Sequence, residues 1–210
     1  MHYSEALKRP FTDFRKLILG ILLTIVPIVN FFALGYVLEC ARTANRQRFK
    51  LPEWDQWGEK FVNGFFMVVI GFVYFIPAAV YAVLAFGTVI INVLEGKGIE
   101  QLIASSAGLV IIGVIILLIT AYVFPSAILS FGFSKKLGKA FNINLVFKRA
   151  FTARYFKAWI VGALTYLVIA LALGGIKGLS PAFAIQQVGN AIISFVGGTI
   201  FYTVIGEDYK

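Results

Sequence analysis

The chain has 210 residues, of which 60% are hydrophobic and only 14% are charged, and its mean hydropathy is +0.86. Soluble domains are roughly half apolar and about a quarter charged, so a soluble fold of this length could not bury so much apolar surface. The composition therefore predicts an integral membrane protein. One cysteine and one histidine exclude an internal disulfide and a Cys/His metal site of the usual kind, and no cofactor is expected.

The apolar stretches predict helices, because none of them alternates strictly between apolar and polar residues as a barrel strand does. A helix needs about 20 apolar residues to cross the hydrocarbon core. We expect an all-α helical bundle forming a single membrane domain over residues 1–210. In chain order its predicted parts are a basic interfacial N-terminus (1–16), a first apolar segment (17–38), an interfacial helix (51–66), two crossings (67–94 and 102–133), a basic amphipathic connector (135–157) and two further crossings (158–176 and 182–205).

The first apolar segment carries Pro27 near its middle and Asn30 three residues later. Proline removes a helical hydrogen bond and clashes with the preceding turn, and the Asn30 side chain could serve the freed backbone groups. Each half of the segment is too short to span, so the preferred interpretation is a re-entrant helical hairpin followed by four crossings. The alternative is a single kinked crossing, giving five crossings, because proline is common in membrane helices.

Lysine and arginine gather beside the apolar segments, so we attribute the net charge of +9 to membrane topology and expect no nucleic-acid partner. Four basic residues precede residue 17, five lie between residues 38 and 61, and seven lie in the connector. Loops rich in Lys and Arg stay cytoplasmic. We therefore expect a multi-pass protein of the cell (plasma) membrane with a cytoplasmic C-terminus. The hairpin would place all three basic segments inside, whereas a single first crossing would leave the N-terminal four outside.

The three tryptophans, Trp54, Trp57 and Trp159, fall in or beside the segments expected at the inner surface. Tryptophan prefers the headgroup level, where its ring is partly dry and partly wet. We interpret these residues as interfacial anchors.

The connector mixes basic residues with aromatic and aliphatic ones. One interpretation is a surface helix that holds anionic lipid headgroups. The simpler interpretation is a cytoplasmic connector whose charges only set the topology. The candidate lipid contacts are Lys135, Lys136, Lys139, Lys148, Arg149, Arg154 and Lys157.

Two further features are candidate functional elements. Glu39 and Arg42 lie three residues apart at the inner end of the first segment, so on a helix they could form an ion pair. Pro77 and Pro125 are candidate helix breaks, which could open backbone carbonyls to an ion as in transporters with broken helices. Each of these prolines follows a tyrosine by three residues, a similarity that chance and shared lipid composition explain better than an internal repeat.

Several patterns in the N-terminal part of the chain resemble a known family. They are Tyr3-x-x-Ala6-Leu7-x-x-Pro10-Phe11-x-Asp13, Gly20-x-Leu22-Leu23-x-x-x-Pro27-Ile28-x-Asn30-Phe31 and Leu51-Pro52-Glu53-Trp54-x-x-Trp57-Gly58-x-x-Phe61-x-x-Gly64. Together they are similar to an uncharacterised, largely archaeal family of polytopic membrane proteins catalogued as a domain of unknown function (the 4013 family). The resemblance implies a membrane protein of archaeal origin and brings no activity, cofactor or catalytic residue.

The sequence contains no catalytic signature, so an enzyme is not expected. No phosphate loop or dinucleotide fingerprint occurs, and no serine has a histidine in plausible reach. Two classes of function remain. The first is a non-catalytic lipid-interacting, scaffolding or accessory membrane module, with anionic headgroups at its basic face. The second is a small channel or transporter of a neutral solute or ion that uses proline-broken helices. The sequence leaves open a homo-oligomer or another membrane partner.

Overall fold

The computed structural model describes residues 2–178 and 183–209, and the regular structure within these ranges is entirely helical. Four helical segments are long and apolar enough to cross a membrane. They are α4 (Trp57–Leu94), α5 (Ile99–Ser134), α7 (Ala153–Gly178), and a last segment built from α8 (Phe183–Ile192), the π-helical turn Ile193–Gly197 and α9 (Gly198–Glu207). The predicted all-α membrane protein with four full crossings is therefore confirmed.

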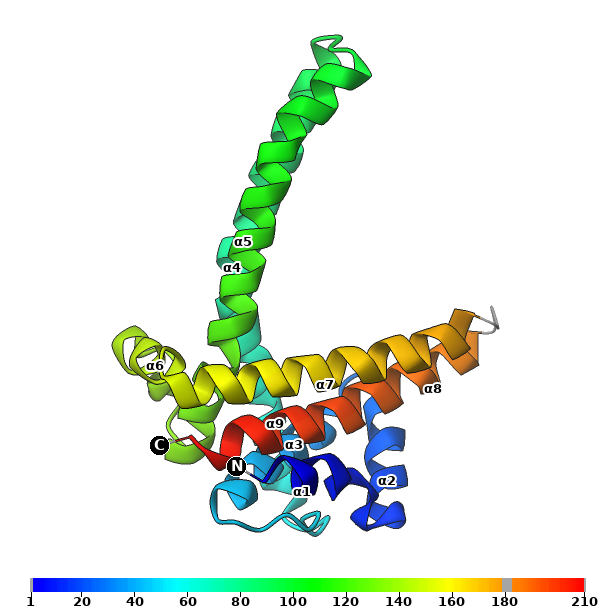
Figure 1. The fold of residues 1–210 in the computed structure, drawn as a ribbon, viewed down its shortest axis with the longest axis vertical. Helices are drawn as coiled ribbons and strands as arrows, with labels where there is room; N and C mark the ends of the chain where they lie inside the picture. Colours follow the sequence, from blue (N-terminus) through cyan, green and yellow to red (C-terminus); the bar gives the residue numbers. More distant parts are fainter. Residues whose placement is uncertain (1, 179–182, 210) are drawn as a thin grey trace.

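The spanning helices form two hairpins that rise from a common base (Figure 1). One hairpin is α4 with α5, and the other is α7 with α8 and α9; the two diverge at a steep angle (Figure 1). The base contains the short helices together with the start of α4, the end of α5, the start of α7 and the end of α9 (Figure 1). Its short helices are α1 (Tyr3–Lys8), the 3₁₀ turn Arg9–Thr12, α2 (Phe14–Ile25), α3 (Asn30–Asn45) and α6 (Ile143–Ala150).

The first apolar segment is a helical hairpin. Helix α2 ends at Ile25, Pro27–Val29 form a turn, and α3 begins at Asn30. The residues on either side of this hairpin touch each other, since Trp54 Nε1 donates to the carbonyl of Lys16 at 3.2 Å. The chain therefore returns to where it entered, as the preferred interpretation requires. At about 1.5 Å per residue, neither helix is long enough to cross a core of about 30 Å.

Asn30 has a different role from the one predicted. Its backbone N–H, and not its side chain, bonds the turn, donating to the carbonyls of Val26 at 2.9 Å and Pro27 at 3.0 Å. The side chain faces a cavity described below.

The prediction of a separate interfacial helix over residues 51–66 is wrong. Residues 51–56 are not helical, and α4 runs without interruption from Trp57 past the expected boundary at residue 67. The segment is held against α3, because Leu51 is buried in the core and the carbonyl of Pro52 accepts from the hydroxyl of Tyr36 at 2.9 Å.

Pro77 and Pro125 do not break their helices, so that prediction is also wrong. Both lie inside continuous helices, α4 and α5. A helical proline leaves the carbonyl four residues earlier without its usual donor. For Pro125 that carbonyl belongs to Ala121, and it accepts instead from Trp159 Nε1 at 3.3 Å. A neighbouring helix thus supplies the missing donor, which makes a break unnecessary.

The other predicted boundaries shift by a few residues. Helix α5 begins before residue 102, and α7 begins before residue 158. The connector over residues 135–157 contains a 3₁₀ turn (Leu137–Lys139), α6 and the start of α7. The predicted boundary at residue 182 lies outside the described residues.

The core of the base is the crossing of α3 and α4. A Cβ placed on Gly35 would lie 1.9 Å from the carbonyl oxygen of Lys60, and one on Gly64 would lie 1.8 Å from that of Phe31. The two backbones are therefore in direct contact, which only glycine permits. On its other side α3 packs against α9, where a Cβ on Gly206 would lie 2.6 Å from Ala41 Cα. Because α3 lies between α4 and α9, it places one of its faces beside the start of α4. The candidate site described in the next subsection lies there.

Candidate functional site

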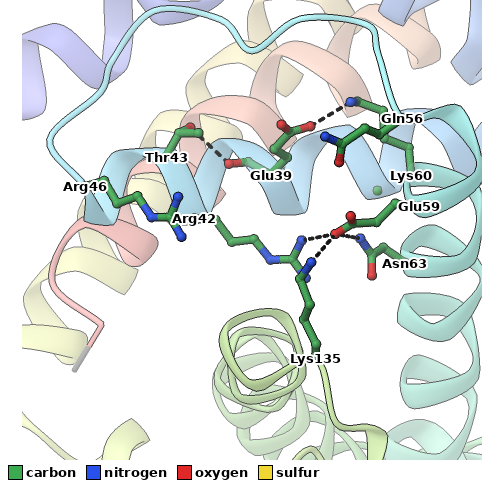
Figure 2. A pocket seen from close by; sticks show the side chains of 10 residues that line it. Glu39, Arg42, Thr43, Arg46, Gln56, Glu59, Lys60, Asn63 and Lys135 are labelled. Carbon is green, nitrogen blue, oxygen red and sulfur yellow. Dashed lines mark hydrogen bonds and ion pairs between the residues drawn. The ribbon is translucent and has the colours of Figure 1, made fainter.

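A polar cavity of about 240 Å³ lies at the base, between α3, the start of α4 and the residue that follows α5 (Figure 2). Four basic and two acidic side chains line it, with several uncharged groups. The charged residues are Arg42, Arg46, Lys60, Lys135, Glu39 and Glu59. We call this the basic cavity.

The predicted ion pair between Glu39 and Arg42 is wrong. The Glu39 carboxylate lies 2.8 Å from Lys60 Nζ, and Arg42 Nη1 lies 2.9 Å from Glu59 Oε1. Both residues of α3 therefore pair with α4 and not with each other. The close crossing at Gly35 is the cause, because it places the first turn of α4 beside this face of α3.

Arg42 is held in a fixed orientation with one donor unused. Its Nε donates to the carbonyl of Gly132 at 2.5 Å, and Nη1 donates to Glu59. Its Nη2 is buried and has no hydrogen-bond partner among the described residues. Glu59 Oε1 also accepts from Lys135 Nζ at 3.0 Å and from Asn63 Nδ2 at 3.4 Å, so three donors share this one oxygen.

The ammonium of Lys60 is fully paired with acceptors inside this cavity. Its side chain is only 3% exposed, and its ammonium contacts Glu39 and the Asp55 carboxylate at 3.1 Å. It also donates to the Asp55 carbonyl at 2.6 Å. An ammonium has three N–H donors, and all three have an acceptor here, so Lys60 is not available to a ligand.

Arg46 completes the cavity as an exposed guanidinium with no partner in the described part of the chain. It is the residue that directly follows α3, four residues after Arg42 (Figure 2). Four basic side chains thus face two carboxylates, and even with Asp55 included the cluster stays positive.

The seven predicted lipid contacts do not form one cluster. Of the seven, only Lys135 lines the basic cavity. Arg149 stacks on Tyr209, with its guanidinium carbon 4.8 Å from the ring centroid, and donates to the hydroxyl at 3.0 Å. Arg154 lines a separate cavity of about 210 Å³ together with Arg149 and Asp208.

The remaining members of the set are solvent-accessible. They are Lys136, Lys139, Lys148 and Lys157. None of them forms an ion pair within the described ranges. Exposed aromatic side chains lie among them on α6 and its neighbours, namely Phe147, Phe151 and Phe156.

The three tryptophans occupy different environments. Trp54 is partly buried and stacks on Tyr36, with ring centroids 4.0 Å apart. Trp57 is 41% exposed and makes an edge contact with Phe32. Trp159 is tied to α5 through the carbonyl described above. Of the three, Trp57 has the exposure that an interfacial anchor needs, and the anchoring role stays a prediction.

A second, less polar cavity of about 270 Å³ lies between the turn of the first hairpin, α7 and the π-helical turn. Asn30, Tyr166, Ser194 and Tyr202 face it, and their side chains have no hydrogen-bond partner among the described residues. π-Helical turns occur frequently at functional sites. We call this the intramembrane cavity.

Sequence reasoning missed a fully buried cation, Arg9. Its Nη1 donates to the carbonyl of Cys40 at 2.7 Å and to Thr203 Oγ1 at 3.1 Å. Its Nη2 donates to Thr43 Oγ1 and to the carbonyl of Lys50. Arg9 thus ties the N-terminal segment to α3 and α9, and nothing in the sequence distinguishes it from the basic residues around it.

The repeated Tyr-x-x-Pro pattern also has a structural role. The hydroxyl of Tyr74 donates to the carbonyl of Ala140 at 2.7 Å, and that of Tyr122 donates to the carbonyl of Ala150 at 2.6 Å. These carbonyls precede and end α6, so the two tyrosines hold the connector at both ends.

Within residues 2–178 and 183–209, no group of three or more His, Cys, Asp or Glu side chains is placed to hold a metal ion. A family model described as "Protein of unknown function (DUF4013)" matches residues 18–178. That range contains the basic cavity and the whole connector. No curated protein and no solved structure matches the chain.

Proposed function

Because this match spans most of its length, the chain belongs to the DUF4013 family of proteins of unknown function, and we propose that it is a non-catalytic membrane module that binds anionic lipid headgroups. The observation that carries the proposal is the group of exposed, unpaired lysines on the connector beside exposed phenylalanines. Cations next to aromatic side chains suit the headgroup level, where anionic lipids attract the charge and the rings enter the acyl boundary.

We further propose that this basic face lies at the cytoplasmic leaflet of the cell membrane, with the C-terminus on the same side. Both chain ends lie at the base (Figure 1), where the Glu207 carboxylate lies 2.8 Å from His2 Nδ1. The basic segments before α2, after α3 and after α5 meet at this base. Short loops that are rich in Lys and Arg typically lie on the cytoplasmic side. Partners of this surface are lipids and not nucleic acid, because the basic groups border lipid-facing helices.

The test replaces connector lysines without touching a packed residue. In Lys139→Gln/Lys148→Gln, we expect the thermal stabilisation of the purified protein by short-chain phosphatidylglycerol to fall to about half or less. Lys97→Gln, at the far end of the α4–α5 hairpin, should keep the full stabilisation and serves as the control. An unchanged response in the double variant would refute the proposal.

A channel or transporter of a neutral solute is the second candidate, and the intramembrane cavity favours it. Unpartnered amide and hydroxyl groups facing a cavity between spanning helices could exchange hydrogen bonds with a small uncharged solute. Flux of glycerol or urea into liposomes carrying the purified protein tests this. Solute-specific flux that Asn30→Ala abolishes would establish transport in place of the lipid module.

A further inference from the structure

We propose that the basic cavity is a phosphate-binding site, in which Arg42, Arg46 and Lys135 hold the phosphate group of a lipid headgroup or of a soluble phosphate. This inference deepens the proposed function, and its lipid form rests on that function. It assigns to one defined pocket a ligand that the connector lysines would contact only loosely.

The charge balance favours an anion. The two carboxylates are already used, Glu39 by Lys60 and Glu59 jointly by Arg42 and Lys135. A bound cation would compete with these basic groups for the two carboxylates and would face three positive side chains. Arg42 and Lys135 share the single negative charge of Glu59, so one positive charge is not compensated. A bound oxyanion would compensate it.

The hydrogen-bonding capacity also favours an oxyanion. Arg42 is fixed through Gly132 and Glu59, yet its Nη2 has no acceptor among the described residues. The Arg46 guanidinium has none either. Guanidinium groups match the geometry of phosphate oxygens, and buried donors left unpaired are costly.

The start of α4 adds a third favourable element. Gln56, the residue that precedes this 38-residue helix, lines the cavity and provides no side-chain cap. The first-turn N–H groups of a helix and its positive dipole end attract phosphate.

Position and size suggest a headgroup and not a whole lipid. Trp57, directly after the lining residue Gln56, is exposed at the start of α4, and tryptophan prefers the headgroup level. At about 240 Å³ the cavity is smaller than the about 300–1,000 Å³ of sites for drug-sized ligands. It therefore suits a phosphate with the first atoms of the group that carries it.

The test compares two double variants that each remove two positive charges from the base. Arg46→Gln/Lys135→Gln alters the cavity, whereas Lys8→Gln/Arg48→Gln alters exposed residues that neither line the cavity nor belong to the connector. Equilibrium binding of dihexanoyl phosphatidic acid and of inorganic phosphate is measured on the purified protein in a neutral detergent, with dihexanoyl phosphatidylcholine as the zwitterionic reference. We expect the cavity variant to bind about tenfold more weakly and the control less than about twofold more weakly.

The two probes distinguish the sources of the phosphate. Competition by inorganic phosphate at a similar concentration would identify a site for soluble phosphate, and saturable binding of phosphatidic acid alone would identify a lipid site; both support the proposal. Equal losses in the two double variants, or no saturable binding of either probe to the unaltered protein, would overturn it. Should the cavity double variant not fold, Arg46→Gln against Arg48→Gln decides, because the Arg46 side chain has no partner in the described structure.

The outcome is separable from that of the proposed function. Loss of phosphatidylglycerol stabilisation in Lys139→Gln/Lys148→Gln, with phosphate affinity unchanged in Arg46→Gln/Lys135→Gln, would leave the lipid module standing and remove the cavity proposal. The reverse pair of results would keep the phosphate site and remove the connector as the lipid-binding surface.

Discussion

Arg9 is fully buried, and no carboxylate in the described ranges pairs with it. Its charge is balanced by four neutral oxygen acceptors from α3, α9 and the loop after α3. A guanidinium can reach several acceptors at once because its donors form a rigid fork, which a lysine cannot reproduce.

Replacing Arg9 with methionine should therefore destabilise the protein strongly. The Arg9→Met variant leaves buried carbonyls and hydroxyls without their donor, so we expect a loss of about 2–4 kcal/mol in the free energy of unfolding. Denaturation in detergent, followed by helical circular dichroism, measures it. The exposed neighbour in Lys8→Met should change stability by less than about 0.5 kcal/mol, and a similar loss in both variants would contradict this account.

Asp13 caps α2, where its Oδ1 accepts from the N–H groups of Arg15 at 3.0 Å and Lys16 at 3.2 Å. The pKa of Asp13 is lowered, chiefly because the Lys16 N–H donates to the carboxylate and secondarily by the charge of Lys16. A lowered folded-state pKa means that the contribution to stability is present above the ordinary value of 3.8 and is lost as the pH falls through the folded-state value.

The Asp13→Asn variant should therefore show a shallower loss of stability on acidification, because asparagine can still cap the helix but does not titrate. Thermal unfolding midpoints between neutral pH and about pH 3 measure the slope. A slope identical to that of the unaltered protein would show that Asp13 does not contribute to the acid response.

At the scale of elements, the contact of α3 with α4 depends on two glycines. A methyl group at Gly35 or Gly64 would enter the backbone of the facing helix, so Gly35→Ala and Gly64→Ala should separate the helices and open the basic cavity. We expect a lower melting temperature and a higher rate of cysteine labelling at the buried Cys40. Gly87→Ala is the matched control, because a Cβ there meets nothing within 4 Å and alanine favours the helix.

The elements themselves were largely predictable, and their contacts were not. Apolar runs near the length of a bilayer predict spanning helices, and Pro27 correctly predicts the turn of the first hairpin. The pairing of Glu39 with Lys60 depends instead on where α4 crosses α3, which local spacing does not encode. For the same reason the basic cavity joins Arg46 and Lys135, which the sequence assigned to separate loops.

The false prediction over residues 51–66 has a similar origin. The sequence predicted a helix over this range, yet residues 51–56 are not helical, the Pro52 carbonyl bonds to Tyr36, and Leu51 is buried in the core. Tertiary contacts thus outweigh a weak local preference. The Tyr-x-x-Pro similarity has a structural role that its spacing does not predict, because both tyrosines bond to carbonyls of the connector.

For the whole molecule, the hairpin formed by α2 and α3 fixes which loops share a side of the membrane. In a Cys40→Ser background, cysteines at positions 8 and 48 should resist a membrane-impermeant maleimide on intact cells, and a cysteine at position 97 should react. The Lys8→Cys, Arg48→Cys and Lys97→Cys variants alter exposed side chains, so folding should be preserved. External labelling at positions 8 and 97, with position 48 protected, would establish a single crossing by the first segment.

The steep divergence of the two long hairpins has a mechanical consequence (Figure 1). Membrane helices tilt by up to about 40° from the bilayer normal, so a flat bilayer favours a smaller angle between the pairs. Pro77 and Pro125 lie at nearly one height of the α4–α5 pair, where the rings of Phe75 and Phe124 meet at 5.8 Å. Each proline removes one backbone hydrogen bond of its helix, so the pair resists bending least at this level, between the base and the loop around Gly96. A change in the curvature or thickness of the surrounding lipid would then change the angle at which the α4–α5 pair leaves the base.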